Sequence, residues 1–145
     1  MFSRIVVGTD GSDTASAAVA VALELARQSG ATVHFVSAYK DPATSVAVAH
    51  AGVAAIPDPS LTDAARMVCE QVLAETTKGI EGVHVENHIV CGPPADMILQ
   101  VASGVGADLI VVGSKGMKGA RRIIGSVPNS VAHGAPCHVL IAKTA

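Results

Sequence analysis

Short apolar segments alternate with longer Ala- and Leu-rich segments along the whole chain, and this alternation constrains the fold more than any other feature. Five segments have the apolar content of β-strands: 5–7, 32–38, 84–90, 109–112 and 138–142. Four have the spacing of helices: 14–28, 60–77, 95–105 and 127–133. Strands that alternate with helices pair in parallel through right-handed crossovers. The sequence therefore predicts an open, five-stranded parallel α/β sheet with helices on both faces.

The composition fits one domain over residues 1–145. Half of the residues are apolar, 2% are aromatic and none is Trp, so the core must consist of Val, Ala, Ile and Leu. The scarcity of aromatic side chains argues against nucleic-acid binding through base stacking. Segment 40–59 contains three prolines and is expected to be a long loop. Ser60 or Thr62 is expected to cap the helix that follows it.

The three cysteines, Cys69, Cys91 and Cys137, are an odd number and form no CxxC pair. This pattern disfavours a disulfide framework and a cysteine-based zinc site. The first residues turn polar too soon for a signal peptide, and no uninterrupted run reaches about 18 apolar residues. These features predict a cytoplasmic protein that does not span a membrane.

Two of the predicted strands end in similar turns. Residues 5–11 read IVVGTDG and residues 110–116 read IVVGSKG, so one turn presents Asp10 and the other Lys115. In doubly wound sheets, ligands bind beyond the carboxyl ends of strands, where the winding direction reverses. A strand order of 3-2-1-4-5 makes the two turns neighbours there, so we expect a ligand site between them. A chance match of two Val- and Ile-rich strand ends is the alternative explanation of the similarity.

The segment 113–126, GSKGMKGARRIIGS, combines four glycines with four basic side chains. All 12 acidic residues of the chain lie between Asp10 and Asp108. With five basic residues in each part, the first 108 residues carry a net charge of −7 and the last 37 carry +5. Accessible glycine N–H groups and the start of the helix expected at Val127 favour a bound anion such as phosphate. The alternative is a solvated basic face.

Asp10 has two interpretations. Its carboxylate can bind a ribose hydroxyl or a phosphate-bound Mg²⁺, or it can hydrogen-bond its own backbone in the turn. The position at the end of the first strand favours the ligand. Asp13 is expected to cap the first helix or to interact with its dipole. The chain has neither a Walker pattern, G-x-x-x-x-G-K-[ST], nor the dinucleotide pattern G-x-G-x-x-G after its first strand.

The histidines raise the question of a metal site. Of the six, His84 and His88 are close in sequence and share one face of a predicted strand. A metal ion would need a third ligand, so exposed or core histidines are the favoured interpretation.

Three stretches resemble the universal stress protein family: VGTDGS at 7–12, GSKG…GSVP at 113–128 and APCHVLIA at 135–142. The resemblance covers nearly the whole chain. It implies a Rossmann-like, adenine nucleotide alpha hydrolase-like fold that binds ATP or cyclic AMP, with Mg²⁺ accompanying the nucleotide. Nucleotide-binding members carry G-x2-G-x9-G-[ST] in the basic segment; here Gly113, Gly116, Gly125 and Ser126 match the pattern with a second gap of eight residues.

The resemblance also implies roles for individual residues. Asp10 corresponds to the acid near the ribose and phosphate, and through the nucleotide it would hold Mg²⁺ indirectly. Ser126 either contacts phosphate or caps the next helix, and the backbone of Ala38 is placed at the adenine. The predicted nucleotide-binding residues are Thr9, Asp10, Ala38, Gly113, Gly116, Arg122, Gly125, Ser126 and Val127. Family members commonly dimerise through the last strand, here Cys137–Ala142, which as an edge strand needs a cover.

Three functions follow from these observations. The favoured one is a stress-response regulatory protein whose bound adenine nucleotide sets conformation or partner affinity, because no catalytic base is evident. The second is a slow ATP hydrolase or phosphotransferase, in which Asp10 holds Mg²⁺ and Lys115 or Arg122 stabilises the transferred phosphoryl group. The third is a dimeric interaction protein that has lost nucleotide binding.

Overall fold

The computed structural model describes residues 1–41, 59–114 and 127–143. Within these ranges, five parallel strands form one sheet in the order β3-β2-β1-β4-β5, which confirms the predicted topology. The strands are β1 (Arg4–Gly8), β2 (Thr32–Tyr39), β3 (Val85–Cys91), β4 (Leu109–Gly113) and β5 (His138–Ala142). Each lies within one residue or so of its predicted bounds, because the apolar runs that predict the strands are also the buried ones.

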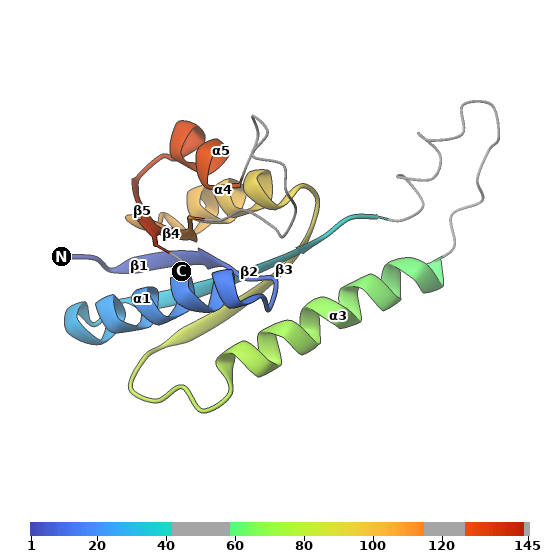
Figure 1. The fold of residues 1–145 in the computed structure, drawn as a ribbon, viewed down its shortest axis with the longest axis horizontal. Coiled ribbons are helices and arrows are strands. Elements are labelled where there is room, and N and C mark those ends of the chain that lie inside the picture. Colours follow the sequence, from blue (N-terminus) through green and yellow to red (C-terminus); the bar gives the residue numbers. More distant parts are fainter. Residues whose placement is uncertain (42–58, 115–126, 144–145) are drawn as a thin grey trace.

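Helices cover both faces of the sheet (Figure 1). On one face lie α1 (Asp13–Ser29) and α3 (Pro59–Thr77), and on the other lie α4 (Pro94–Val105) and α5 (Val127–Gly134). Side chains alternate between the two layers, so Ile5 and Val7 pack towards α1 whereas Val6 packs against α4. The buried residues of the central strands, 5–7 in β1 and 109–112 in β4, are therefore all apolar, as in parallel strands covered on both faces.

The register brings the ends of the central strands together. β1 pairs with β4 through Val7 and Val111, and with β2 through Gly8 and Val36. The turn after β1 and the end of β4 are consequently neighbours at the carboxyl edge of the sheet, as the strand order predicts.

The helix boundaries show how local chemistry starts and stops each element. The Ser12 hydroxyl accepts a hydrogen bond from the Ala15 N–H (3.2 Å) and caps α1, so Asp13 is a first-turn residue near the helix dipole and not the cap. Gly30 ends α1 in the left-handed conformation with φ of 72°.

The predicted cap of α3 is wrong. This helix begins at Pro59, so Ser60 and Thr62 lie inside its first turn. The Thr62 hydroxyl instead donates a hydrogen bond to the Asp41 carboxylate (3.1 Å), which ties the start of α3 to the residues after β2. Proline is well suited to the first helical position because its missing N–H has no partner there in any case. Residues 42–58, most of the predicted long loop, lie outside the described ranges.

Over the described ranges, none of the helices combines the length and the apolar content needed to cross a membrane.

Candidate functional site

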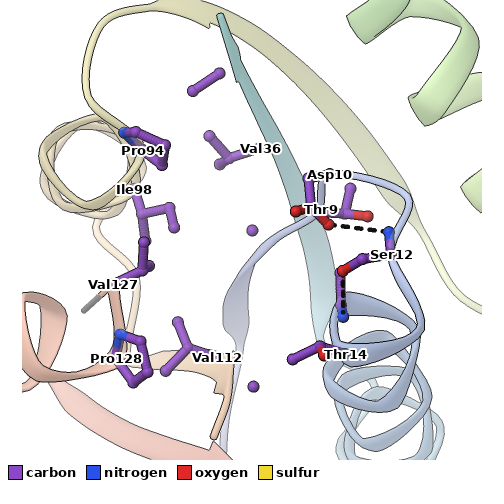
Figure 2. Close-up of a pocket in the computed structure, with 14 residues that line it drawn as sticks. Thr9, Asp10, Ser12, Thr14, Val36, Pro94, Ile98, Val112, Val127 and Pro128 are labelled. Carbon is purple, nitrogen blue, oxygen red and sulfur yellow. Dashed lines mark hydrogen bonds between the residues drawn. The ribbon is translucent and has the colours of Figure 1, made fainter. Parts of the chain in front are cut away.

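A pocket lies at the carboxyl edge of the sheet, between the ends of β1, β2 and β4 (Figure 2). It holds about 680 Å³ of space, its open mouth included. The pocket therefore occupies the place where doubly wound sheets bind their ligands.

One side of the pocket is polar and is built by the turn between β1 and α1. The backbone N–H of Thr9 donates to the Val36 carbonyl (2.9 Å), and the Thr9 hydroxyl accepts from the Gly11 N–H (3.3 Å). Asp10 Oδ1 accepts a hydrogen bond from the Ser12 N–H (2.9 Å), shown in Figure 2. The turn thus fixes the Asp10 carboxylate by one oxygen, while the described residues give Oδ2 no hydrogen bond.

The other side of the pocket is apolar. It comes from β2, β4 and the starts of α4 and α5, and in Figure 2 these side chains face the polar turn across the hollow. The apolar residues are Val36, Ala38, Pro94, Ile98, Val112, Val127 and Pro128. A ligand with one flat apolar part and one polar or charged part would match both sides.

Three helices begin at this pocket. Residues at or next to the first turns of α1, α4 and α5 line it, namely Ser12 and Thr14, Pro94, and Val127. The start of a helix carries a partial positive charge and N–H groups that lack partners within the helix. The end of the pocket beyond the strands is accordingly suited to an anion.

Gly113, at the end of β4, lies where α1 packs closely against this strand. A Cβ atom at this position would lie 2.7 Å from Thr14 Cγ2 and 2.9 Å from the Thr14 carbonyl oxygen. Glycine at the end of β4 is therefore required by the approach of α1, whatever ligand the pocket takes.

The universal stress protein family model matches residues 1–143, which is nearly the whole chain. The chain belongs to this family. A universal stress protein of Thermus aquaticus, named for its place in the QAH/OAS sulfhydrylase 3' region, is 34% identical to this chain over 152 aligned residues. The alignment covers 99% of this chain and 100% of the relative.

Two solved universal stress proteins show the same fold with a nucleotide present. A universal stress protein crystallised in complex with cAMP has a TM-score of 0.75, 30% identity and 99% coverage of both chains. The Archaeoglobus fulgidus universal stress protein in complex with dAMP has a TM-score of 0.64 and 26% identity, with coverage of 97% of this chain and 98% of its own.

The structure of this universal stress protein brings five of the predicted residues together. Thr9, Asp10, Ala38, Gly113 and Val127 all line the one pocket, although they come from four separate elements or turns. The remaining predicted residues, Gly116, Arg122, Gly125 and Ser126, lie outside the described ranges. In the sequence, the basic segment runs from Gly113 to Ser126 and is followed by Val127. Gly113 and Val127 both line the pocket, so a lining residue flanks the segment at each end.

Sequence reasoning found Ala38 and Val127 but missed the rest of the apolar side of the pocket. Val36 shares a face with Ala38 two residues later on β2, so strand alternation could have identified it. Ile98 and Pro94 could not be found in that way, because only the packing of α4 across β1 and β2 places them there.

Proposed function

We propose that this universal stress protein is a regulatory protein that binds an adenine nucleotide in the pocket between β1 and β4. The observation that carries the proposal is the two-sided lining of that pocket, at the edge of the sheet where three helices begin. The whole chain acts as one domain in this proposal. Bound nucleotide would set the conformation of the pocket turns and hence the affinity for partners.

The two sides of the pocket assign the parts of the nucleotide. The adenine would pack on Val36, Ile98 and the chain at Ala38, where backbone groups can hydrogen-bond its edge. The ribose would face Thr9 and Asp10, and the phosphates would lie towards the starts of the helices and the basic segment. None of the described residues that line this pocket is aromatic, so aliphatic side chains would supply the contact with the base.

The relatives support an adenine nucleotide, since two of them were crystallised with cAMP and dAMP. We extend this to ATP because Lys115, Lys118, Arg121 and Arg122 follow Gly113 closely in sequence and could neutralise a triphosphate. In this proposal the basic segment 113–126 still binds phosphate, although eight residues and not nine separate Gly116 from Gly125.

Asp10 fits a role in holding Mg²⁺ with the nucleotide. Mg²⁺ in such sites is held by one or two carboxylates together with phosphate oxygens and water. With Oδ1 engaged by the turn, Oδ2 is the atom that would face the ion or its water shell. Other residues of the turn supply no second carboxylate to the pocket, so the ion would arrive bound to the phosphates.

The test is calorimetric titration with Mg-ATP and with cAMP, comparing Asp10→Asn with Asp13→Asn. Asparagine at position 10 preserves the Oδ1 acceptor for the Ser12 N–H but removes the charge. Loss of a hydrogen bond to a charged group costs about 1.5–3 kcal/mol, so Mg-ATP affinity should fall about tenfold or more. Asp13 is equally exposed and does not line the pocket, so its variant is the matched control.

The two possible failures have different meanings. If the unmodified protein binds neither nucleotide at millimolar concentration, the proposed function is wrong. If it binds but Asp10→Asn and Asp13→Asn behave alike, the pocket function stands and the assignment of Asp10 is wrong.

A further inference from the structure

A second cluster of polar side chains lies on the sheet, and none of its members lines the pocket proposed for the nucleotide. The register pairs His34 of β2 with Glu86 of the edge strand β3, and Val36 with His88. Paired residues of parallel strands point to the same face, so His34, Glu86 and His88 share the face that α4 covers. Along the sequence, Glu86 thus lies between His84 and His88, the two histidines predicted to share one face of this strand.

The potential ligand atoms are already close together. His34 Nδ1 lies 3.0 Å from His88 Nε2 and 3.4 Å from Glu86 Oε2, and all three ligand atoms are within 4.8 Å of one another. A tetrahedral zinc ion with bonds of about 2.0–2.1 Å holds its ligand atoms about 3.3 Å apart. The cluster therefore needs only small side-chain rotations to surround such an ion.

His34 is the buried member of the cluster. Its Nε2 is buried, and the described residues give it no hydrogen-bond partner in either tautomer. When a metal ion binds Nδ1, the ring proton is on Nε2. Because Nε2 lacks a partner among the described residues with or without the ion, metal binding leaves no further polar atom of this ring unsatisfied.

The remaining sides of the cluster suggest an open site. The Glu86 side chain is half exposed, and its Oε1 lies 3.7 Å from Nε2 of the exposed His84. His84 therefore lies on the solvent side of the carboxylate, too far from it for a direct hydrogen bond. Solvent can reach the fourth position of an ion at this edge.

We propose that His34, Glu86 and His88 form a binding site for a divalent transition-metal ion of the zinc type, which joins the edge strand β3 to β2. Two imidazoles and one carboxylate are ligands that such ions prefer, and Mg²⁺ or Ca²⁺ would favour oxygen ligands instead. The site does not depend on nucleotide binding. The alternative is a hydrogen bond between the two histidines with no metal.

Cobalt absorption spectroscopy of the untagged, metal-free protein tests this site. Co²⁺ in a four-coordinate site of nitrogen and oxygen ligands gives visible bands far stronger than those of hydrated Co²⁺. We expect a band that saturates at one equivalent and disappears when Zn²⁺ is added. Because His34 is buried and its loss could disturb folding, the variants are His88→Gln and Glu86→Gln, each checked by circular dichroism.

The variants separate a built site from binding to surface histidines. His88→Gln and Glu86→Gln should abolish the band, whereas His84→Gln, which changes an exposed side chain without a hydrogen bond to Glu86, should leave the band in place. His133→Gln changes an exposed histidine of α5 outside the cluster and should leave the titration unchanged. No strong band in the unmodified protein, or a band that survives both ligand substitutions, would overturn the proposal.

Discussion

Asp10 shows how one side chain can satisfy both interpretations that the sequence leaves open. Its Oδ1 closes the turn by accepting from the Ser12 N–H, which is the local role of an aspartate after a strand. The same bond fixes the carboxylate at the rim of the pocket, with its second oxygen available to a ligand. From the sequence, closing the turn and binding a ligand look like alternative roles of Asp10. The structure shows that Oδ1 can do the first while Oδ2 remains available for the second.

Gly113 allows a residue-scale prediction about stability. Gly113→Ala should lower the free energy of unfolding by about 1–3 kcal/mol, because the new methyl group meets the Thr14 backbone, which cannot turn away as a side chain could. Gly104→Ala, on an open part of α4, should instead raise it by up to about 1 kcal/mol. Urea unfolding of both variants measures the difference. Equal stability of the two would contradict the close packing of α1 against β4.

At the scale of elements, the sequence predicts strands better than helix starts. The strands are short runs that must be apolar because helices cover both faces, so their bounds follow from composition. The start of α3 could not be predicted, because Thr62 bonds to Asp41, which is 21 residues earlier in the chain. Ser12 and Asp13 are both reasonable caps of α1 by residue type, and only the geometry of the turn selects Ser12.

The edge strand β5 leads to a prediction about assembly. It is the last strand of the sheet, it contains no proline, and Ile141 is 49% exposed. Such an edge is prone to pair with another chain, and a charge on it opposes the pairing. We propose a homodimer through Cys137–Ala142 and expect Ile141→Lys to shift it towards monomer.

Sedimentation velocity at several protein concentrations checks this expectation. Met67→Lys, at a position of α3 that is 59% exposed, is the matched control and should sediment like the unmodified protein. An unmodified protein that stays monomeric throughout, or an Ile141→Lys variant that remains dimeric, would contradict the proposed interface.

At the scale of the whole molecule, the strand order is what creates both sites. The order β3-β2-β1-β4-β5 brings Asp10 beside Gly113, which are 103 positions apart, and His34 beside Glu86 and His88. The pocket at the ends of β1 and β4 could be predicted because two similar strand ends and a family resemblance pointed to it. The histidine cluster could not, because the sequence points to His84 with His88, whereas the register of β2 against β3 brings His88 together with Glu86 and His34.

Mapping the binding of cAMP residue by residue shows whether the pocket between β1 and β4 takes an adenine nucleotide. In amide spectra of the ¹⁵N-labelled protein, we predict that cAMP shifts Thr9, Val36, Ala38, Gly113 and Val127, which line the pocket from different elements. Signals of Gln71 and Val72, in a second hollow between α1 and α3, should not move. Shifts confined to that second hollow, or none at millimolar cAMP, would contradict nucleotide binding in the pocket between β1 and β4.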